Sequence, residues 1–221
     1  MRRIPLRPLR GFVERATPAY PIHARAAASD GLLPAALPHS HYQDQTTLRL
    51  DRAQVTHHSA SALLADVLEG FLCNPPAGVG HLMALRNRLV APLRLRTSPL
   101  GCPVSSLLST DRSRLFAGRY PVLDARIDAG DSCAEVLLGA DDRHLRFRSS
   151  VRVQRCAEGH VEISLGSRVQ TRNAFGRLYM ALIDAAHRHY VAPALLRRAV
   201  EHALAPELAA VDAWTAPPAH G

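Results

Sequence analysis

Apolar and polar residues alternate in two adjacent stretches of the second half of the chain. In residues 144–154 the apolar positions are Leu145, Phe147, Val151 and Val153. In residues 161–171 they are Val161, Ile163, Leu165 and Val169. A period of two is typical of strands with one buried and one solvent-facing side. Because residues 156–160 between them are few and contain Gly159, we predict an antiparallel hairpin.

The apolar spacing becomes helical directly after the second strand. The positions that recur with a helical period are Phe175, Leu178, Tyr179, Leu182, Ile183, Ala186 and Tyr190. This stripe predicts a long helix that packs across the sheet. Pro193 falls inside the pattern and predicts a kink or a break, because proline lacks a backbone N–H and clashes with the preceding turn. The pair Ala205-Pro206 predicts the end of the helix.

The first half of the chain predicts one strand and two helices before the remaining strands. Residues 42–50 contain an alternation that predicts a strand, and Ser59 or Ser61 can cap the helix that follows. Asn74-Pro75-Pro76 ends that helix. The other predicted elements are a helix at 79–90, a short strand at 93–97, a connection at 98–113, and strands at 116–123 and 132–139 joined by a turn at 128–131.

This order of elements predicts a single α+β domain over residues 41–205. One curved antiparallel sheet packed on the long C-terminal helix satisfies it, as in helix-grip-like (START/SRPBCC-like) folds. Such an architecture leaves a cavity between the concave face of the sheet and the helix. Residues 1–40 are rich in proline and lack a clear period, so we expect a poorly ordered N-terminal arm. We expect a loose C-terminal tail at residues 206–221.

The charge of the chain is strongly basic. Its 27 Lys+Arg residues and 19 Asp+Glu residues give a net charge of +8. All of the basic residues are Arg and they are spread along the chain, so we expect a basic solvated surface and not a nucleic-acid site. The sequence has neither an apolar stretch of about 18 residues nor the apolar segment of a secretory signal. We therefore expect a cytoplasmic protein that does not insert into a membrane.

Metal, redox and hydrolase chemistry are not favoured by the sequence. The four cysteines are widely separated, and the twelve histidines form no His-Glu-x-x-His pattern. We therefore expect free thiols, no metal site and no cofactor. The serines within residues 105–109 have no Gly-x-Ser-x-Gly elbow around them, which argues against a hydrolase triad.

Three pieces of the sequence resemble a bacterial family catalogued as domain of unknown function 2867. They are residues 82–90, residues 139–148, and residues 175–179 together with His187-Arg188, and the resemblance covers about residues 42–203. The family is similar in layout to helix-grip proteins, which often hold apolar ligands. The resemblance implies no established activity and no assigned catalytic residues.

The chain departs from the pattern of this family at two places. Ala185-Ala186 stands where the family has a proline and an aromatic residue, which would enlarge a cavity near the helix. Arg146 stands where an acidic residue is common, which makes the open sheet face more basic. The family also occurs fused to nucleotide-binding reductase-like domains, but this chain has no Gly-x-Gly-x-x-Gly motif, so that function does not transfer.

We expect the protein to bind a small, largely apolar ligand in the cavity between the sheet and the C-terminal helix. The expected ligand-binding residues are Asp142, His144, Phe147, Leu165, Tyr179, Leu182 and His187, with Val151 and Ile163 as further wall residues. The apolar side chains and Tyr179 would form the wall, and the two histidines would add polarity near its ends.

Two other functions stay open. An interaction module could bind an anionic partner through arginines that share one sheet face, which are Arg146, Arg148, Arg152 and Arg168, together with Arg172. An enzyme could use His and Asp side chains of the same cavity as acid and base. The sequence leaves open which of these holds, the identity of the ligand and the oligomeric state.

Each candidate also has a purely structural interpretation. Asp141 and Asp142 suit a turn before a strand. Tyr179 suits a core tyrosine whose hydroxyl bonds to the backbone. His187 suits a helix-edge histidine that is paired with a carboxylate.

Overall fold

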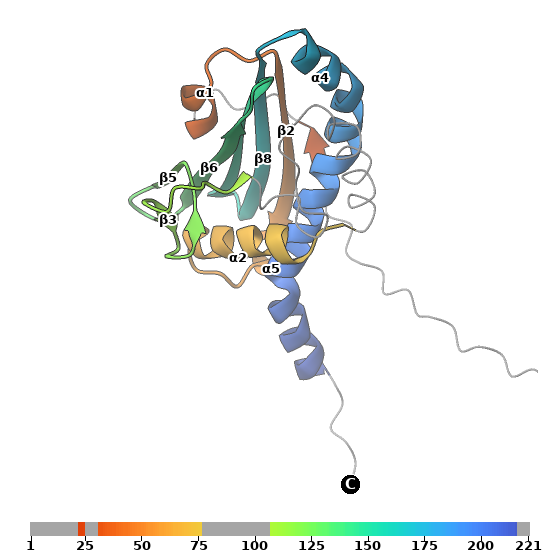
Figure 1. Cartoon of the computed structure of the whole chain (residues 1–221). Coiled ribbons are helices and arrows are strands. Elements are labelled where there is room, and N and C mark those ends of the chain that lie inside the picture. The colour runs from red at the N-terminus through yellow and green to blue at the C-terminus, as the bar shows by residue number, and fades with distance from the viewer. Residues whose placement is uncertain (1–21, 25–30, 77–106, 216–221) are drawn as a thin grey trace, which may run out of the picture.

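The computed structural model describes residues 22–24, 31–76 and 107–215 (Figure 1). In this part of the chain, six antiparallel strands form one sheet in the order β1–β2–β8–β7–β6–β5. Their bounds are β1 Ile22–Ala24, β2 Tyr42–Asp51, β5 Asp124–Ile127, β6 Cys133–Asp141, β7 Leu145–Arg155 and β8 His160–Thr171. The chain therefore has the α+β antiparallel architecture that the alternating stretches predict.

The central hairpin has the predicted register. Val151 of β7 pairs with Leu165 of β8, and Val153 pairs with Ile163, so the apolar positions of both strands share one side of the sheet. β2 pairs with the other edge of β8, where Leu48 lies beside Ile163. We call this apolar side of the sheet the concave face and the opposite side the outer face.

The helices are α1 Leu32–Ala36, α2 Ala60–Cys73, α4 Ala174–Ala186 and α5 Ala192–Thr215, with a short 3-10 turn η1 at Arg52–Gln54 and a π-helical turn η4 at His187–Val191. Of the two serines that could cap α2, Ser59 does so, because its Oγ accepts a hydrogen bond from the N–H of Ala62 at 3.2 Å. None of the helices in the described residues has both the length and the apolar composition of a membrane-spanning segment.

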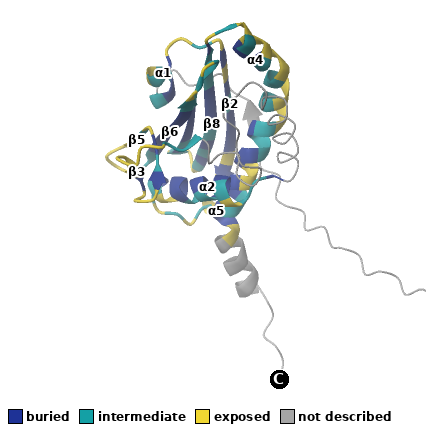
Figure 2. Cartoon of the chain, in the orientation of Figure 1, coloured by how far each residue is buried: buried dark blue, intermediate teal, exposed yellow. Residues whose placement is uncertain are grey.

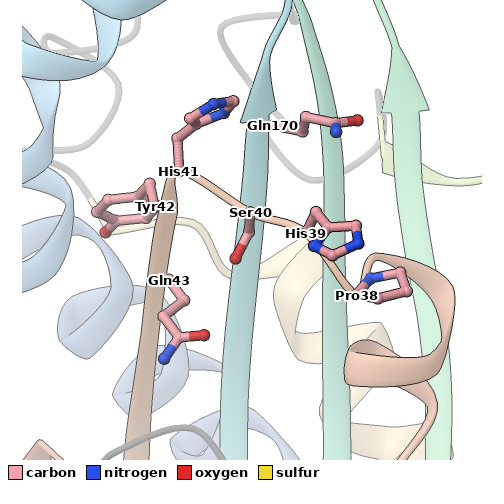
Figure 3. Close-up of a pocket in the computed structure, with 7 residues that line it drawn as sticks. All are labelled: Pro38, His39, Ser40, His41, Tyr42, Gln43 and Gln170. Atoms are coloured by element: carbon pink, nitrogen blue, oxygen red, sulfur yellow. The ribbon is translucent and has the colours of Figure 1, made fainter.

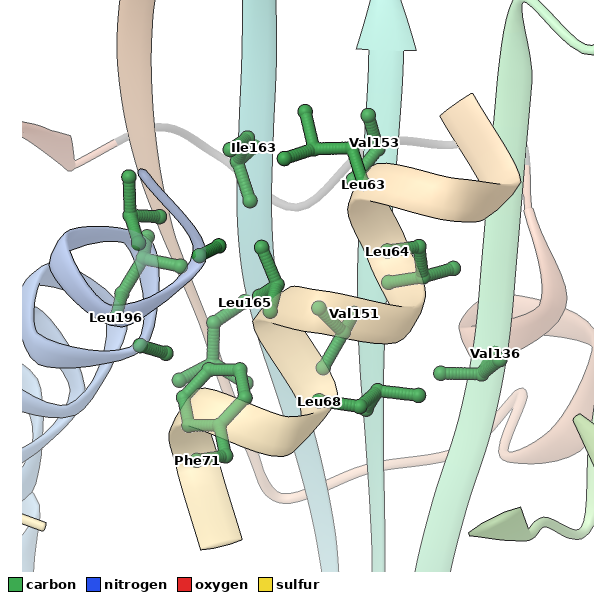
Figure 4. Close-up of a cluster of buried hydrophobic side chains, with 14 of the residues drawn as sticks. Leu63, Leu64, Leu68, Phe71, Val136, Val151, Val153, Ile163, Leu165 and Leu196 are labelled. Atoms are coloured by element: carbon green, nitrogen blue, oxygen red, sulfur yellow. The ribbon is translucent and has the colours of Figure 1, made fainter. Parts of the chain in front are cut away.

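The main core fills one half of the concave face. Leu64, Leu68 and Phe71 of α2 and Leu196 of α5 are almost fully buried there (Figure 4). They face side chains of the central strands, which are Val136, Val151, Val153, Ile163 and Leu165. Burying each such side chain stabilises the fold by about 1.5–3 kcal/mol. Leu165, Val151 and Ile163, which we expected to line a ligand cavity, are thus packed against helices α2 and α5.

A second, smaller and less buried apolar cluster, which we call the upper cluster, lies where the sheet meets α4. Tyr42, Val169 and Met180 are buried in this upper cluster. The side chains packed against them are only partly buried, and they are Leu145, Phe147, Tyr179 and Ile183. The apolar stripe expected to face the sheet from the long helix is rotated relative to the side that does so, because Leu178 and Leu182 are 58% and 70% exposed. Figure 2 shows this exposed outward side of α4.

Gly176 explains the orientation of α4. A Cβ atom at this position would lie 2.3 Å from the carbonyl oxygen of His144, so the backbones of α4 and of the β6–β7 turn touch here. Gly176 therefore faces the sheet, and so do Met180 and Ile183 at the following helical spacings. His187 continues this line, although the sequence pattern placed it outside the core-facing stripe.

The helical chain from α4 to α5 is continuous, with one change of pitch. The π-helical turn η4 directly precedes Pro193, and the missing N–H of this proline removes one hydrogen bond from the continuous helix without breaking it. The predicted end of the helix at Ala205-Pro206 is wrong, since α5 continues to Thr215. A proline inside a helix removes one hydrogen bond but does not oblige the helix to stop.

Other sequence-based expectations differ from the structure in the first two thirds of the chain. Residues 31–40, which we expected within a poorly ordered arm, contain α1, and Leu33 and Leu37 are buried. The strand expected at 116–123 is a small hairpin of β3 Leu115–Phe116 and β4 Tyr120–Pro121, which reverses at Ala117 and Gly118 with positive φ angles. The helix expected at 79–90 and the strand at 93–97 lie outside the described residues.

The crossing of α2 and α5 depends on Gly70. A Cβ atom here would lie 2.4 Å from the carbonyl oxygen of Ala199. We expect Gly70→Ala to lower the free energy of unfolding by at least about 1 kcal/mol, because overpacking outweighs the gain in helix propensity. Gly130→Ala is the matched control, since nothing lies within 4 Å of its Cβ position. Urea denaturation measures both, and equal stabilities of the two variants would contradict the close crossing.

Candidate functional site

A buried carboxylate, a phenol and an imidazole meet on the concave face beside the upper cluster. Tyr42 and Asp44 lie two residues apart on β2, so both side chains project to this face. His187 is the first residue of η4. Asp44 Oδ2 accepts a hydrogen bond from the Tyr42 hydroxyl at 2.7 Å and lies 3.1 Å from His187 Nδ1. We call these three residues the Asp44 site.

A row of polar residues crosses the sheet at this level. Asp44 pairs in register with Ser167 of β8, and Ser167 pairs with Ser149 of β7. All three are buried. Ser149 Oγ donates to the carbonyl of Gly166 at 2.7 Å. This polar row separates the main core from the upper cluster.

The Asp44 side chain is only 5% exposed, yet it is held ionised. Burial alone would raise the pKa of this carboxyl. The hydrogen bonds from His187 and Tyr42 and the positive charge of Arg188 outweigh burial and lower the pKa below its ordinary value. The other carboxylate oxygen, Oδ1, is buried and has no hydrogen-bond partner within the described residues.

Two neighbours complete the electrostatics of the Asp44 site. Burial and the adjacent Asp44 carboxylate raise the pKa of Tyr42, so its hydroxyl stays protonated and donates. The Arg188 guanidinium lies 5.1 Å from the centre of the Tyr42 ring and pairs with Asp184 at 3.2 Å.

This arrangement gives His187 a defined orientation. An imidazole with its proton on Nδ1 donates to Asp44 Oδ2, and its Nε2 is then the acceptor. The His187 side chain is 25% exposed, so it stands at the boundary between the buried carboxylate and solvent. Such a pair can accept or deliver a proton at Nε2, or accept a hydrogen bond from a ligand.

The structure brings together some of the expected site residues and separates others. His187, Phe147 and Tyr179 lie at the Asp44 site or in the upper cluster. Leu165 belongs to the main core, and Leu182 points to solvent, so neither borders this site.

Asp142 and His144 belong to the β6–β7 turn. The Asp142 carboxylate accepts from the backbone N–H of Arg143. His144 lies 2.8 Å from the side chain of Asn173, the N-cap of α4, and its ring meets Phe175 edge-on at 4.9 Å. Their contacts therefore support the turn and the start of α4, which for Asp142 agrees with its interpretation as a turn residue.

Sequence reasoning missed Tyr42, Asp44 and Arg188. One signal for Asp44 was present, because it falls in phase with the inward positions of the predicted first strand, Thr46, Leu48 and Leu50. A carboxylate on the apolar side of a strand needs a partner, so this position marks a buried polar contact.

The arginines of the outer face are partly neutralised and partly covered. Arg146, Arg148 and Arg172 share the carboxylate of Asp141 at 3.2, 2.6 and 3.4 Å. Arg168 Nη1 donates to the carbonyl of Leu37 at 3.0 Å.

Helix α1 covers the middle of the outer face. Leu33 packs over Gly166, and the backbone N–H of Leu32 donates to the buried carboxylate of Glu135 at 3.0 Å. Burial raises the pKa of Glu135, although that hydrogen bond and the charge of Arg152 oppose the shift. Arg152 is therefore separated by α1 from the arginines at the upper end of the sheet.

A pocket of about 460 Å³ opens on the outer face at the start of β2. Figure 3 shows its lining, which is Pro38, His39, Ser40, His41, Tyr42, Gln43 and Gln170. Within the described residues, no group of three or more His, Cys, Asp and Glu side chains is arranged to hold a metal ion. Cys73, Cys133 and Cys156 are free thiols, and Cys102 lies outside the described residues.

The pairing of Asp44 with His187 predicts a measurable pKa. We expect a carbon NMR titration of the Asp44 carboxyl to give a pKa below that of an ordinary aspartate, and His187→Ala to raise it, because burial then dominates. The stabilising contribution of the ionised carboxylate is present above the unfolded-state pKa and is lost as the pH falls through the lower folded-state pKa. His189→Ala, an exposed position in the same turn, is the control. An unchanged Asp44 pKa in His187→Ala would contradict the pairing.

A family model described as "Protein of unknown function (DUF2867)" matches residues 36–194. This range contains the Asp44 site, the pocket on the outer face (the outer pocket) and the whole sheet from β2 onward. No curated protein and no solved structure matches the chain. Since the match covers more than half of the sequence, the chain belongs to the family described as protein of unknown function DUF2867.

Proposed function

We propose that the protein binds a small ligand with an apolar body and one polar group on the concave face, beneath α4 and η4. The observation that carries this proposal is the Asp44 carboxylate. It is buried at the edge of an apolar cluster whose outer side chains are only partly buried, and its Oδ1 has no hydrogen-bond partner within the described residues. A buried acceptor without a partner costs about 1–3 kcal/mol, which a ligand donor would recover.

The apolar body of the ligand would lie against the upper cluster. Phe147, Tyr179 and Ile183 are only partly buried, in contrast to the closely packed side chains of the main core. In the helix-grip-like arrangement that we propose, α2 and α5 occupy one half of the concave face and the ligand binds under the other half.

The polar group of the ligand would be a hydrogen-bond donor. Asp44 Oδ1 offers an acceptor, and the ionised carboxylate would favour an amine or a hydroxyl over an anionic group. His187 Nε2 offers a second acceptor at the solvent side. A ligand with a hydroxyl or amino group on an apolar skeleton fits this set of acceptors.

Binding of an extended anionic partner by the arginines of the outer face is less well supported than binding of a small ligand on the concave face. Helix α1 covers the middle of this face, and Asp141 shares its charge with three of the arginines. A polyanion would therefore meet a short and partly neutralised patch instead of a continuous basic surface.

Acid–base catalysis at His187 is a second candidate function. The contact of its Nδ1 with Asp44 at 3.1 Å orients the ring and supports a proton on Nε2 when the imidazole is charged. A π-helical turn is also frequent at functional sites. The proton acceptor would be Nε2, and the substrate would be the ligand bound against the upper cluster.

Native mass spectrometry of the full chain tests ligand binding. We expect a bound small molecule at stoichiometric amount, which denaturation releases for identification. Ile183→Ala should reduce its occupancy at least fivefold, because it removes part of the apolar wall. Leu182→Ala is the matched control, since this neighbouring side chain points to solvent. An equal loss of ligand in both variants would contradict binding at this face.

A protein purified without a bound molecule requires a direct ligand screen. The probes are long-chain alcohols and primary amines, with fatty acids of equal length for comparison. Binding of the alcohol or amine that weakens at least tenfold in Asp44→Ala would support the proposal. Tighter binding of the fatty acid, or binding that Asp44→Ala leaves unchanged, would overturn it.

Hydrogen exchange tests the catalytic candidate. For a bound ligand that also carries a carbonyl group, we expect wild-type protein in D2O to exchange a C–H proton next to that carbonyl for deuterium, and His187→Gln to slow this exchange at least 100-fold. NMR of the ligand measures the rate. Binding without any exchange in the wild type would leave a binding protein and remove the catalytic candidate.

A further inference from the structure

The outer pocket lies on the opposite side of the sheet from the Asp44 site. Its floor includes Gln43 and Gln170, whose positions on β2 and β8 place them on the outer face (Figure 3). The loop before β2 adds the imidazole of His39 and the hydroxyl of Ser40. At about 460 Å³ the pocket has the size that small metabolites occupy.

Arginines continue the floor of this pocket across the sheet. Gln43 pairs in register with Arg168, and Arg168 pairs with Arg148. Gln170 pairs with Arg146. Side chains at paired positions lie on the same face with their Cβ atoms about 5 Å apart, so Arg146 and Arg168 are direct neighbours of the pocket floor.

Arg168 lies beside the pocket floor and supports the loop that lines the pocket. Its Nη1 holds the carbonyl of Leu37, the residue before Pro38 in the pocket lining. Its Nε is buried and has no hydrogen-bond partner within the described residues. A buried guanidinium N–H without a partner favours a negatively charged acceptor.

The neighbouring arginines retain further donors. Arg146 contacts Asp141 through Nε, and in the part of the chain that the structure describes its two terminal amino groups are left as donors. Asp141 provides one carboxylate for three arginines, so positive charge is in excess beside the pocket.

We infer that this pocket binds a small phosphorylated, hydroxyl-bearing molecule, with its phosphate toward Arg146 and Arg168 and its hydroxyl groups against Gln43, Gln170 and His39. Guanidinium groups suit a phosphate because they offer several N–H donors in a plane. Amides and imidazoles suit hydroxyl groups because each can both donate and accept. This pocket and the Asp44 site lie on opposite sides of the sheet and share Tyr42.

Calorimetric titration of the full chain with ribose 5-phosphate tests the inference. We expect saturable binding that weakens at least tenfold in Arg146→Gln and in Gln170→Ala. Arg119→Gln is the matched control, because it removes the same charge from a side chain that pairs with Glu69 elsewhere on the surface. Asp44→Asn should leave the affinity unchanged within twofold, which separates this site from the concave face.

Two comparison probes define the ligand class. Ribose without phosphate should not bind detectably, and inorganic phosphate should bind more weakly than ribose 5-phosphate. Circular dichroism confirms that each variant is folded, and Gln43→Ala replaces any variant that is not. Absence of binding to all of these probes would overturn the inference, and so would an equal loss of affinity in Arg119→Gln, which would indicate general attraction to a basic surface.

Discussion

Helices α2 and α5 cross at Gly70 and Ala199, and their contact with the central strands determines how the rest of the concave face can be used. The two helices bury Leu64, Leu68 and Leu196 against one half of the sheet. That half is closed by side-chain packing, because protein interiors leave little unfilled space. The other half is left to α4 and η4, which contact the sheet through fewer buried side chains. Any site on this face therefore belongs to the upper end of the sheet.

The polar row at the border of the two clusters contains a buried, ionised carboxylate, that of Asp44. A buried carboxylate is tolerated only with charged or hydrogen-bonding partners, and Asp44 obtains them from Tyr42 and from His187. His187 reaches Asp44 from the turn at which the helix changes its pitch. The π-helical turn thus places a titratable ring at the sheet, and the same contact fixes the ring's orientation.

The outer face is organised by a different contact. The short helix α1 is held through Glu135 at its start and through the carbonyl of Leu37, which follows it. Gly166 leaves room for Leu33, so α1 can lie close to the strands. This covering divides the arginines of the face and leaves a polar pocket between the α1–β2 loop and the end of β8. The concave face therefore offers hydrogen-bond acceptors at Asp44, and the outer face offers hydrogen-bond donors at the arginines.

The sequence alone was sufficient for the central hairpin, the strand at 42–50, the helix that ends at Asn74, and the α+β class, because these depend on local periods of two and 3.6 residues. It could not supply the rotation of α4, which the contact between Gly176 and His144 sets and which exposes Leu182. Nor could it pair Asp44 with His187, since 143 residues separate them. Periodicity reports which side of an element is apolar, whereas contacts between distant elements arise only when their backbones pack together.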